Sequence, residues 1–292
     1  MTLPRSAPPD APTAPRRRAP EGSCDTHIHL LGGPGDGPLW PGRVEDPAEG
    51  WDFERYLAAY RAQMEALGIE RTVVVQSILY GTDNRLTARA VSALGRDRAR
   101  GIGLVTDGAT DADLDALVET GLVGVRLNYV HGGVLSWEGV EAMAPRLADR
   151  GLHVQMLLRA DQHMEDLAPR IAALPVPVVL DHMAWPDVAR GRNDPGFEAL
   201  LRLMEAGDVW LKLSAPYRID SPPYAALEPL MAAALAANPT RCLWGSDWPQ
   251  IMLGGADRIP SGAALDLLDA ACPDEATRRA VLVDNPAALY GF

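Results

Sequence analysis

Long apolar runs are absent from this sequence. None of its 292 residues lies in a run of about 18 consecutive apolar residues, the length that a membrane-spanning helix requires. The first 22 residues, MTLPRSAPPDAPTAPRRRAPEG, also lack the apolar segment of a signal peptide. We therefore expect a protein that has no membrane partner.

Cysteine is scarce as well. The chain has three, Cys24, Cys242 and Cys272, and no two of them show C-x-x-C spacing. A zinc finger therefore has no support. A small, odd number of cysteines is typical of a reducing compartment, so we expect a cytoplasmic protein.

Positive charge is the third shortage. Lys and Arg number 27 against 39 Asp and Glu, which gives a net charge of −12. The only basic run is Arg16–Arg18, which we expect to be solvated, and this argues against a nucleic-acid partner. An acidic protein repels anions at long range, so an anionic substrate would need specific arginines in its binding site.

The residues that are present indicate one folded domain. Hydrophobic residues make up 47% of the chain, which is ample for a core, and α/β barrels commonly reach this length as one unit. Residues 1–22 are rich in Pro, Ala and Arg, and we expect them to form a disordered arm. Residues 23–292 are predicted to form a single domain.

Short β-rich runs alternate with longer helical patterns along that domain. Many of the helical segments end at glycine, as helices commonly do. The alternation predicts parallel strands in a (β/α)8 TIM barrel, distorted and with a long loop after the first strand. An open doubly wound sheet is disfavoured because no G-x-G-x-x-G follows the first strand. The predicted strands are 24–29, 71–77, 101–106, 123–129, 152–158, 176–182, 209–214 and 242–247.

The longest connection, residues 30–51, is rich in Gly and Pro and is predicted to be a loop. Loops of this length in a compact domain are often functional lids. A lid over the barrel and a simple surface excursion both remain open.

Polar residues gather where the predicted strands end. His27 and His29 lie two apart on the first strand and so face the same side. Since the strand ends of a barrel meet at one opening, these side chains should converge there. The others in this group are Ser77, Arg126, Asn128, Gln155, His182, Lys212, Ser214, Arg218 and Asp247.

Seven blocks resemble the amidohydrolase superfamily, in its amidohydrolase-2 branch, and specifically the lactonase group of that branch, which includes 2-pyrone-4,6-dicarboxylate lactonase and sugar-acid lactonases. The resemblance runs from about residue 23 to 292. It implies a hydrolase that opens a lactone, a cyclic ester, with His27, His29, His182 and Asp247 as catalytic residues. The blocks are CDTHIHL, VVVQSILYGTDN, GVRLN, VVLDHMA, LKLSAPYR, LWGSDWPQ and DNPAALYGF.

We expect Asp247 to act as the general base on a water, and the three histidines to polarise the lactone carbonyl. Metal-dependent members of the superfamily present a further histidine on a middle strand, where this sequence has Gln155. An amide oxygen is a poor zinc ligand. We therefore expect no required cofactor, and only weak binding of a divalent metal such as zinc by His27, His29 and Asp247.

The expected partner is a small lactone, anionic through a carboxylate or a sugar acid. Arg126 and Arg218 are placed to bind its carboxylate, although pairing of each arginine with a structural Asp or Glu remains open. Trp185 and Trp248 are either apolar walls of the site or core residues. Hydrogen bonds to the substrate are expected from Ser77, Tyr80, Asn84, Asn128 and Gln155.

Two rival functions remain. One is a zinc-dependent decarboxylase of the same branch, against which Gln155 counts. The other is a non-catalytic ligand-binding barrel, which the convergence of an acid, three histidines and two arginines disfavours. The sequence does not indicate an oligomeric state.

Overall fold

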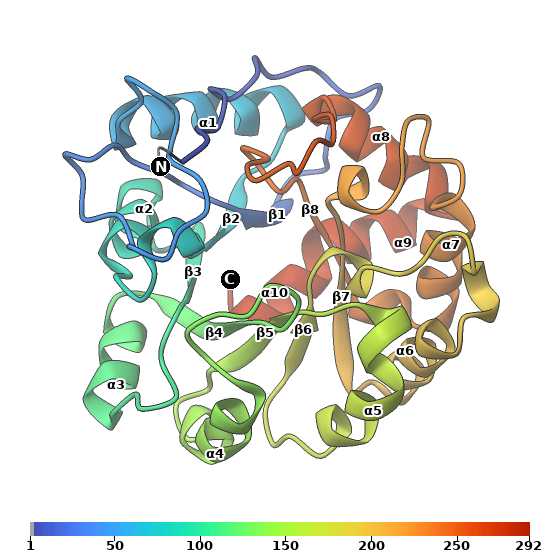
Figure 1. The fold of residues 1–292 in the computed structure, drawn as a ribbon. Coiled ribbons are helices and arrows are strands. Elements are labelled where there is room, and N and C mark those ends of the chain that lie inside the picture. The colour runs from blue at the N-terminus through green and yellow to red at the C-terminus, as the bar shows by residue number, and fades with distance from the viewer. Residues whose placement is uncertain (1–2) are drawn as a thin grey trace.

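The computed structural model describes residues 3–292 as a barrel of eight parallel strands surrounded by helices (Figure 1). The (β/α)8 TIM barrel is thereby confirmed, and each predicted strand overlaps an observed one. The strands follow one another in chain order: β1 (Cys24–Ile28), β2 (Arg71–Val75), β3 (Ala99–Gly103), β4 (Leu122–Asn128), β5 (His153–Leu157), β6 (Val178–Leu180), β7 (Val209–Ser214) and β8 (Cys242–Gly245).

The circle closes between β1 and the end of β8. The Asp247 amide donates to the His27 carbonyl at 2.9 Å, and the His29 amide donates to the Trp248 carbonyl at 2.7 Å. These bonds place the histidine strand directly beside the segment that carries Asp247. Two elements of the site that lie near opposite ends of the chain are thus held together by backbone pairing.

Helices cover the outside of the barrel (Figure 1). Several begin at a side-chain cap, such as Asp52 before α1 and Asp194 before α6, and several end at a left-handed glycine, such as Gly68 and Gly207. Within residues 3–292, none of the helices has the length and apolarity needed to cross a membrane. The helices are α1 (Phe53–Leu67), α2 (Arg85–Leu94), α3 (Asp111–Glu119), α4 (Trp137–Ala148), α5 (Ala160–Ala172), α6 (Pro195–Ala206), α7 (Glu228–Ala237), α8 (Ser261–Ala271), α9 (Glu275–Arg279) and α10 (Asn285–Tyr290).

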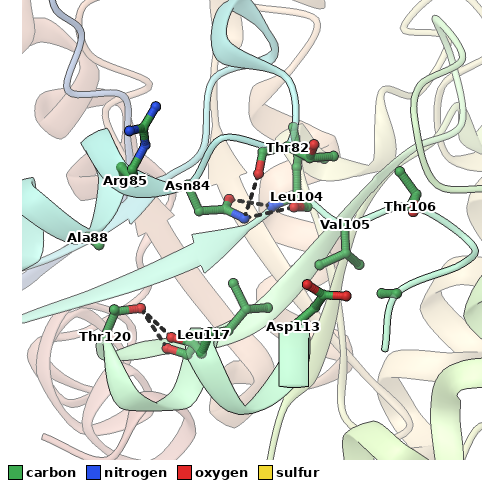
Figure 2. Close-up of a pocket in the computed structure, with 12 residues that line it drawn as sticks. Thr82, Asn84, Arg85, Ala88, Leu104, Val105, Thr106, Asp113, Leu117 and Thr120 are labelled. Carbon is green, nitrogen blue, oxygen red and sulfur yellow. Dashed lines mark hydrogen bonds between the residues drawn. The ribbon is translucent and has the colours of Figure 1, made fainter. Parts of the chain in front are cut away.

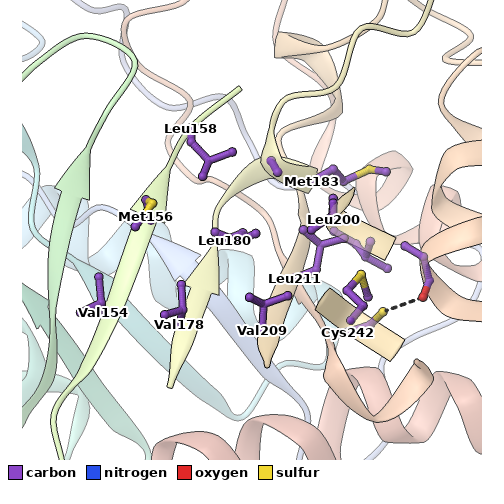
Figure 3. Close-up of a cluster of buried hydrophobic side chains, with 14 of the residues drawn as sticks. Val154, Met156, Leu158, Val178, Leu180, Met183, Leu200, Val209, Leu211 and Cys242 are labelled. Carbon is purple, nitrogen blue, oxygen red and sulfur yellow. Dashed lines mark hydrogen bonds between the residues drawn. The ribbon is translucent and has the colours of Figure 1, made fainter. Parts of the chain in front are cut away.

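The main core lies between the strands and the helices. Figure 3 shows Val154, Val178 and Val209 side by side on consecutive strands, with Leu200 of α6 in the same buried cluster. Because side chains alternate along a strand, the residues between these apolar ones point into the barrel. The outward positions fix the strands against the helices, and the inward positions combine an apolar layer, which includes Val179 and Trp210, with the polar side chains of the site.

Residues 3–22 differ from the disordered arm that composition predicts. They run along the barrel surface, where the Thr13 amide donates to the Ser261 hydroxyl at 3.0 Å and the Arg16 amide donates to Asp266 at 2.8 Å. A further backbone bond joins Ala19 to Leu67. The composition of this segment could not indicate these contacts, because its partners are supplied by α1 and α8.

Candidate active site

Four polar side chains meet at the C-terminal end of the barrel strands. Oδ1 of Asp247 lies 3.5 Å from Nε2 of His27, 3.6 Å from Nε2 of His29 and 4.0 Å from Nε2 of His182. All four are buried. The structure therefore brings together the four residues for which the sequence predicts catalysis.

Local backbone geometry makes this approach possible. A Cβ on Gly245, the last residue of β8, would lie 2.7 Å from the Cβ of His27, so only glycine fits there. His182 and Asp247 both have a left-handed φ, of 53° and 57°. Such conformations are unfavourable for residues with side chains and occur most often at functional sites.

A cavity of about 490 Å³ opens beside this cluster, and His29, His182 and Asp247 form part of its wall. The loop between β1 and α1 contributes Trp40, Gly42, Arg43 and Val44 to the same cavity. That long loop is thus part of the site wall, as the lid interpretation requires, and more than a surface excursion. The rest of the wall includes Arg126, Asn128, His131, Trp185, Arg218, Ile251 and Met252.

One oxygen of Asp247 is fixed while the other stays available. Oδ2 accepts hydrogen bonds from the Tyr217 hydroxyl at 2.5 Å and from Nε of Arg218 at 3.4 Å. Oδ1 is the oxygen that faces the three histidines. Tyr217 was not predicted as a site residue, because a tyrosine in a short turn after β7 carries no distinctive sequence signal.

The charge state of Asp247 follows from these neighbours. Burial alone would raise the pKa of Asp247, but His182, the hydrogen bond with His29 and the Arg218 guanidinium together hold it well below its ordinary range. Burial also lowers the pKa of His182 to about 4 and lowers the pKa of His27 well below its usual value. At neutral pH the site therefore contains an ionised carboxylate beside neutral His27 and His182.

Hydrogen bonds on the far side of two rings fix which nitrogen carries the proton. Nδ1 of His29 lies 2.8 Å from the Val75 carbonyl oxygen, which can only accept. Nδ1 of His27 lies 3.1 Å from a carboxylate oxygen of Asp181. Each ring therefore carries a proton on Nδ1, and neutral His27 presents a bare Nε2 lone pair toward Asp247.

The residues fit one divalent ion. His27, His29 and Asp247 offer ligand atoms that all lie within 4.8 Å of one another. Within residues 3–292, Nε2 of His27 is buried and has no hydrogen-bond partner. Two imidazole nitrogens and one carboxylate oxygen, each oriented by an outer hydrogen bond, are a donor set that zinc accepts.

A second polar layer lies deeper in the barrel. Asp181, Lys212 and Gln155 are fully buried and connected to one another. The Gln155 amide donates to Oδ2 of Asp181 at 3.1 Å and accepts from Nζ of Lys212 at 2.6 Å. Gln155 is therefore part of this internal network and does not line the cavity, contrary to the substrate contact predicted for it.

The two arginines that are predicted to bind a carboxylate differ in how many of their guanidinium nitrogens already have partners in the protein. Arg218 donates to Asp247 and to the carbonyls of Met252 and Ile251. Arg126 lies 3.3 Å from Asp181, and within residues 3–292 its Nε has no hydrogen-bond partner. Each arginine thus has an acidic partner, but Arg126, which lines the cavity, keeps its buried Nε without one.

Four further side chains that the sequence places in the site lie away from the cavity wall. The Ser77 hydroxyl accepts from the Leu79 amide, and the Tyr80 hydroxyl bonds Gly32 in the long loop. Asn84 lies in a separate groove between α2 and α3, where its side chain bonds both backbone groups of Leu104 (Figure 2). Trp248 packs against Tyr56 and Tyr60 in the core, whereas Trp185 and Asn128 do line the cavity.

A common physical reason explains the positions of these four side chains. Each is held by backbone or core partners, for three of the four on distant segments of the chain, and such partners cannot be identified from strand parity alone. His153, in contrast, is expected from its position to be a packed residue, and it is buried beside Tyr290 at the other end of the barrel.

The barrel and its histidine–aspartate cluster define a hydrolase of the amidohydrolase type. Residues 24–292 match the amidohydrolase-2 model, described as amidohydrolase, so the chain belongs to this family. It is similar to the 2-pyrone-4,6-dicarboxylate hydrolase of Comamonas testosteroni, at 33% identity over 293 residues, covering 96% of this chain and 93% of the relative. The 4-sulfomuconolactone hydrolase of Rhizobium radiobacter is 35% identical over 280 residues, covering 93% and 91%.

A solved structure shares the same fold. An apo crystal structure from Agrobacterium tumefaciens shares 27% sequence identity and a TM-score of 0.79, covering 97% of this chain and 98% of that one. The similarity therefore extends over the whole barrel and is not confined to the site motifs.

Proposed function

We propose that this protein hydrolyses a small lactone that carries an anionic group. The observation that carries the proposal is the position of Asp247 in the cavity wall, with its Oδ1 3.5–4.0 Å from three histidine nitrogens. The similarity to relatives named for the hydrolysis of a pyrone dicarboxylate and of a sulfomuconolactone supports a lactone as the substrate class.

Asp247 acts as the general base. Its Oδ1 takes a proton from a water as the water oxygen bonds to the lactone carbonyl carbon. The tetrahedral intermediate then collapses, the ring C–O bond breaks, and the proton returns from Asp247 to the departing oxygen. The product is a hydroxy acid that ionises at neutral pH, so one proton is released for each ring opened.

His182 is the histidine best suited to stabilise the oxyanion directly. Its Nδ1 lies 2.9 Å from the Ser214 hydroxyl, which can donate and so leave the His182 proton on Nε2, toward the cavity. Neutral His27 presents a lone pair at Nε2 instead, so it donates to the carbonyl oxygen only when both of its ring nitrogens are protonated. Loss of one such donor typically costs about 10²–10³ in kcat.

A divalent ion held by His27, His29 and Asp247 would supply Lewis-acid polarisation and a more acidic water. The roles of Asp247 as base and of His182 as donor are defined by this chain's own side chains. Whether the purified protein carries zinc is decided by elemental analysis.

Arg126 is the cavity group that binds the anionic substituent. Its side chain is 9% exposed, and its unpartnered Nε supplies a donor for a carboxylate. Arg218 instead holds Asp247 in place. One guanidinium with an unpartnered nitrogen, in a cavity that Arg43 and His131 also line, suits a substrate with one carboxylate better than a dicarboxylate.

The test is proton release by the purified protein against a panel of sugar-acid lactones, muconolactones and pyrone carboxylates. We expect release with one class, and loss of that release in Asp247→Asn. Circular dichroism and thermal unfolding of the variant serve as the control for folding. A panel without release from any lactone would contradict the proposal and direct the next assays to decarboxylation.

A further inference from the structure

The deeper layer of the barrel contains charges that the proposed reaction does not use. Nζ of Lys212 is fully buried and donates to the Thr26 carbonyl at 2.8 Å and to Gln155 at 2.6 Å. The same nitrogen lies 3.6 Å from Oδ1 of Asp181 and 3.5 Å from Nδ1 of His27. A buried ammonium is costly unless it is paired and hydrogen-bonded, so its position is under strong constraint.

This layer has the composition of a second metal site. His27, Asp181 and His182 offer ligand atoms within 4.8 Å of one another, as do His27, His29 and Asp247 on the cavity side. We call these the inner and outer clusters. The ammonium of Lys212 lies beside two of the three residues of the inner cluster, where a divalent ion would have to bind. Two cations at such a distance in a buried site repel strongly.

We propose that Lys212 is a built-in cation that takes the place of a metal ion at the inner cluster. We further propose that Asp181, which Lys212 keeps ionised, holds the His27 proton on Nδ1 and so leaves the Nε2 lone pair toward Asp247. Lys212 and Asp181 are thus positioning residues, which act on the reaction through His27.

The network accounts for the charge balance that this role needs. Asp181 receives hydrogen bonds from His27 and Gln155, and it also lies near Lys212 and Arg126. With Asp181 neutralised by cations on other strands, His27 can remain neutral and still donate its Nδ1 proton. Gln155 ties the carboxylate to the ammonium, since one amide can donate to the first and accept from the second.

The inference rests on the proposed function for the reaction that His27 serves, but its test requires no turnover. The first measurement is ¹⁵N NMR of the full chain labelled at its six histidines. The His27 signals are identified by their loss in His27→Gln. We expect a protonated Nδ1 and a bare Nε2 at neutral pH. A His27 with its proton on Nε2 would overturn the proposal, whatever the outcome of the lactone panel.

Two aspartate variants separate positioning from general effects of burial. In Asp181→Asn the new amide can turn either its oxygen or its nitrogen to His27, so we expect a mixture of the two His27 tautomers. Asp25→Asn is the matched control. Asp25 is also a buried aspartate, on β1, but it contacts only the backbone amide of His27, besides Ser246, and leaves the ring free. An unchanged His27 signal in Asp181→Asn, or the same change in both variants, would contradict the positioning role.

Metal uptake tests the role of Lys212 as a cation. After chelator treatment, the protein is incubated with excess Zn²⁺, desalted and analysed for bound zinc. Because the two clusters share His27, and one neutral imidazole binds one ion, the comparison is made in a His29→Gln background, which removes a ligand of the outer cluster. There we expect little bound zinc while Lys212 is present and up to one equivalent, at the inner cluster, when Lys212→Met is added. A full equivalent with Lys212 present, or a folded double variant that gains none, would show that the ammonium does not close the inner cluster. Where zinc binds, Asp181→Asn should weaken it about 10–100-fold.

Discussion

Asp181 and Asp247 lie on opposite sides of the same imidazole, and comparing them separates two uses of a buried carboxylate. Asp181 contacts Nδ1 of His27, is fully buried, and is surrounded by Lys212, Gln155 and Arg126. Asp247 faces Nε2 of the same ring but belongs to a cavity of about 490 Å³. One carboxylate has all its partners inside the protein, and the other keeps one oxygen for a ligand.

The difference shows that access, more than charge, distinguishes the two positions. Both carboxylates have a pKa held well below its ordinary range: burial alone would raise it, but His27 and Lys212 outweigh burial at Asp181, as His182 and Arg218 do at Asp247. A sealed carboxylate can only orient its neighbours. A carboxylate in a cavity wall can exchange a proton with a bound molecule.

The largest effect is expected from Asp247→Asn. Asparagine keeps the shape of the side chain but cannot accept the proton from water, so we expect kcat on the identified lactone to fall about 10²–10⁴-fold. Steady-state kinetics measure the loss. If Asp247→Asn kept more than a tenth of the wild-type kcat, Asp247 would not be the general base, and the proposed difference in role between Asp247 and Asp181 would be wrong.

The second largest effect is expected at Asp181, the carboxylate that is fully buried. Lys212→Met leaves Asp181 buried without its ammonium neighbour, and breaking a buried pair from one side costs about 3–5 kcal/mol of unfolding free energy. Urea unfolding gives the value. Arg85→Met, which removes a largely exposed partner of Asp83, is the control, and we expect a much smaller loss because water screens an exposed ion pair. Equal losses in the two variants would contradict a special role of the inner layer.

The sequence predicted the residues around Asp247, which face the cavity, better than the buried residues around Asp181. His27, His29, His182 and Asp247 all lie at strand ends, and in a barrel these ends meet, so strand parity and motif order were sufficient to group them. The barrel itself followed from eight alternations of strand and helix patterns.

Asp181 was missed although it stands next to His182 in VVLDH. Its importance comes from Lys212 and Gln155, which reach it across the barrel interior, and no spacing along the chain records such contacts. The same limit explains why the contacts of residues 3–22 with the barrel, and the bonds of Asn84 to Leu104, could not be foreseen.

The two arginines extend the comparison to the substrate. We expect Arg126→Met to raise KM for the anionic lactone about 10–100-fold, since a hydrogen bond to a charged group contributes about 1.5–3 kcal/mol. A neutral lactone of the same ring size should show little change.

Arg218→Lys should instead lower kcat, because Arg218 orients Asp247. Identical changes of KM and kcat in the two variants would mean that Arg126 and Arg218 do not have separate roles in substrate binding and in orienting Asp247.

The smallest effect is expected from His153, which is buried near Tyr290 at the other end of the barrel interior. Burial lowers the pKa of His153 to about 3, whereas an unfolded histidine titrates at about 6.5. Below that pH the unfolded chain binds a proton that the folded chain does not, so stability falls as pH decreases from 6.5 toward 3. At pH 5 the loss is about 2 kcal/mol for this one group. His153→Gln lacks this contribution. Urea unfolding at pH 8 and pH 5 should therefore show that the wild type loses more stability than the variant, by that amount. If the stability difference between the wild type and the variant stayed constant with pH, His153 would take up a proton within the folded barrel. The end of the barrel interior near Tyr290 would then be as accessible to protons as the cavity end.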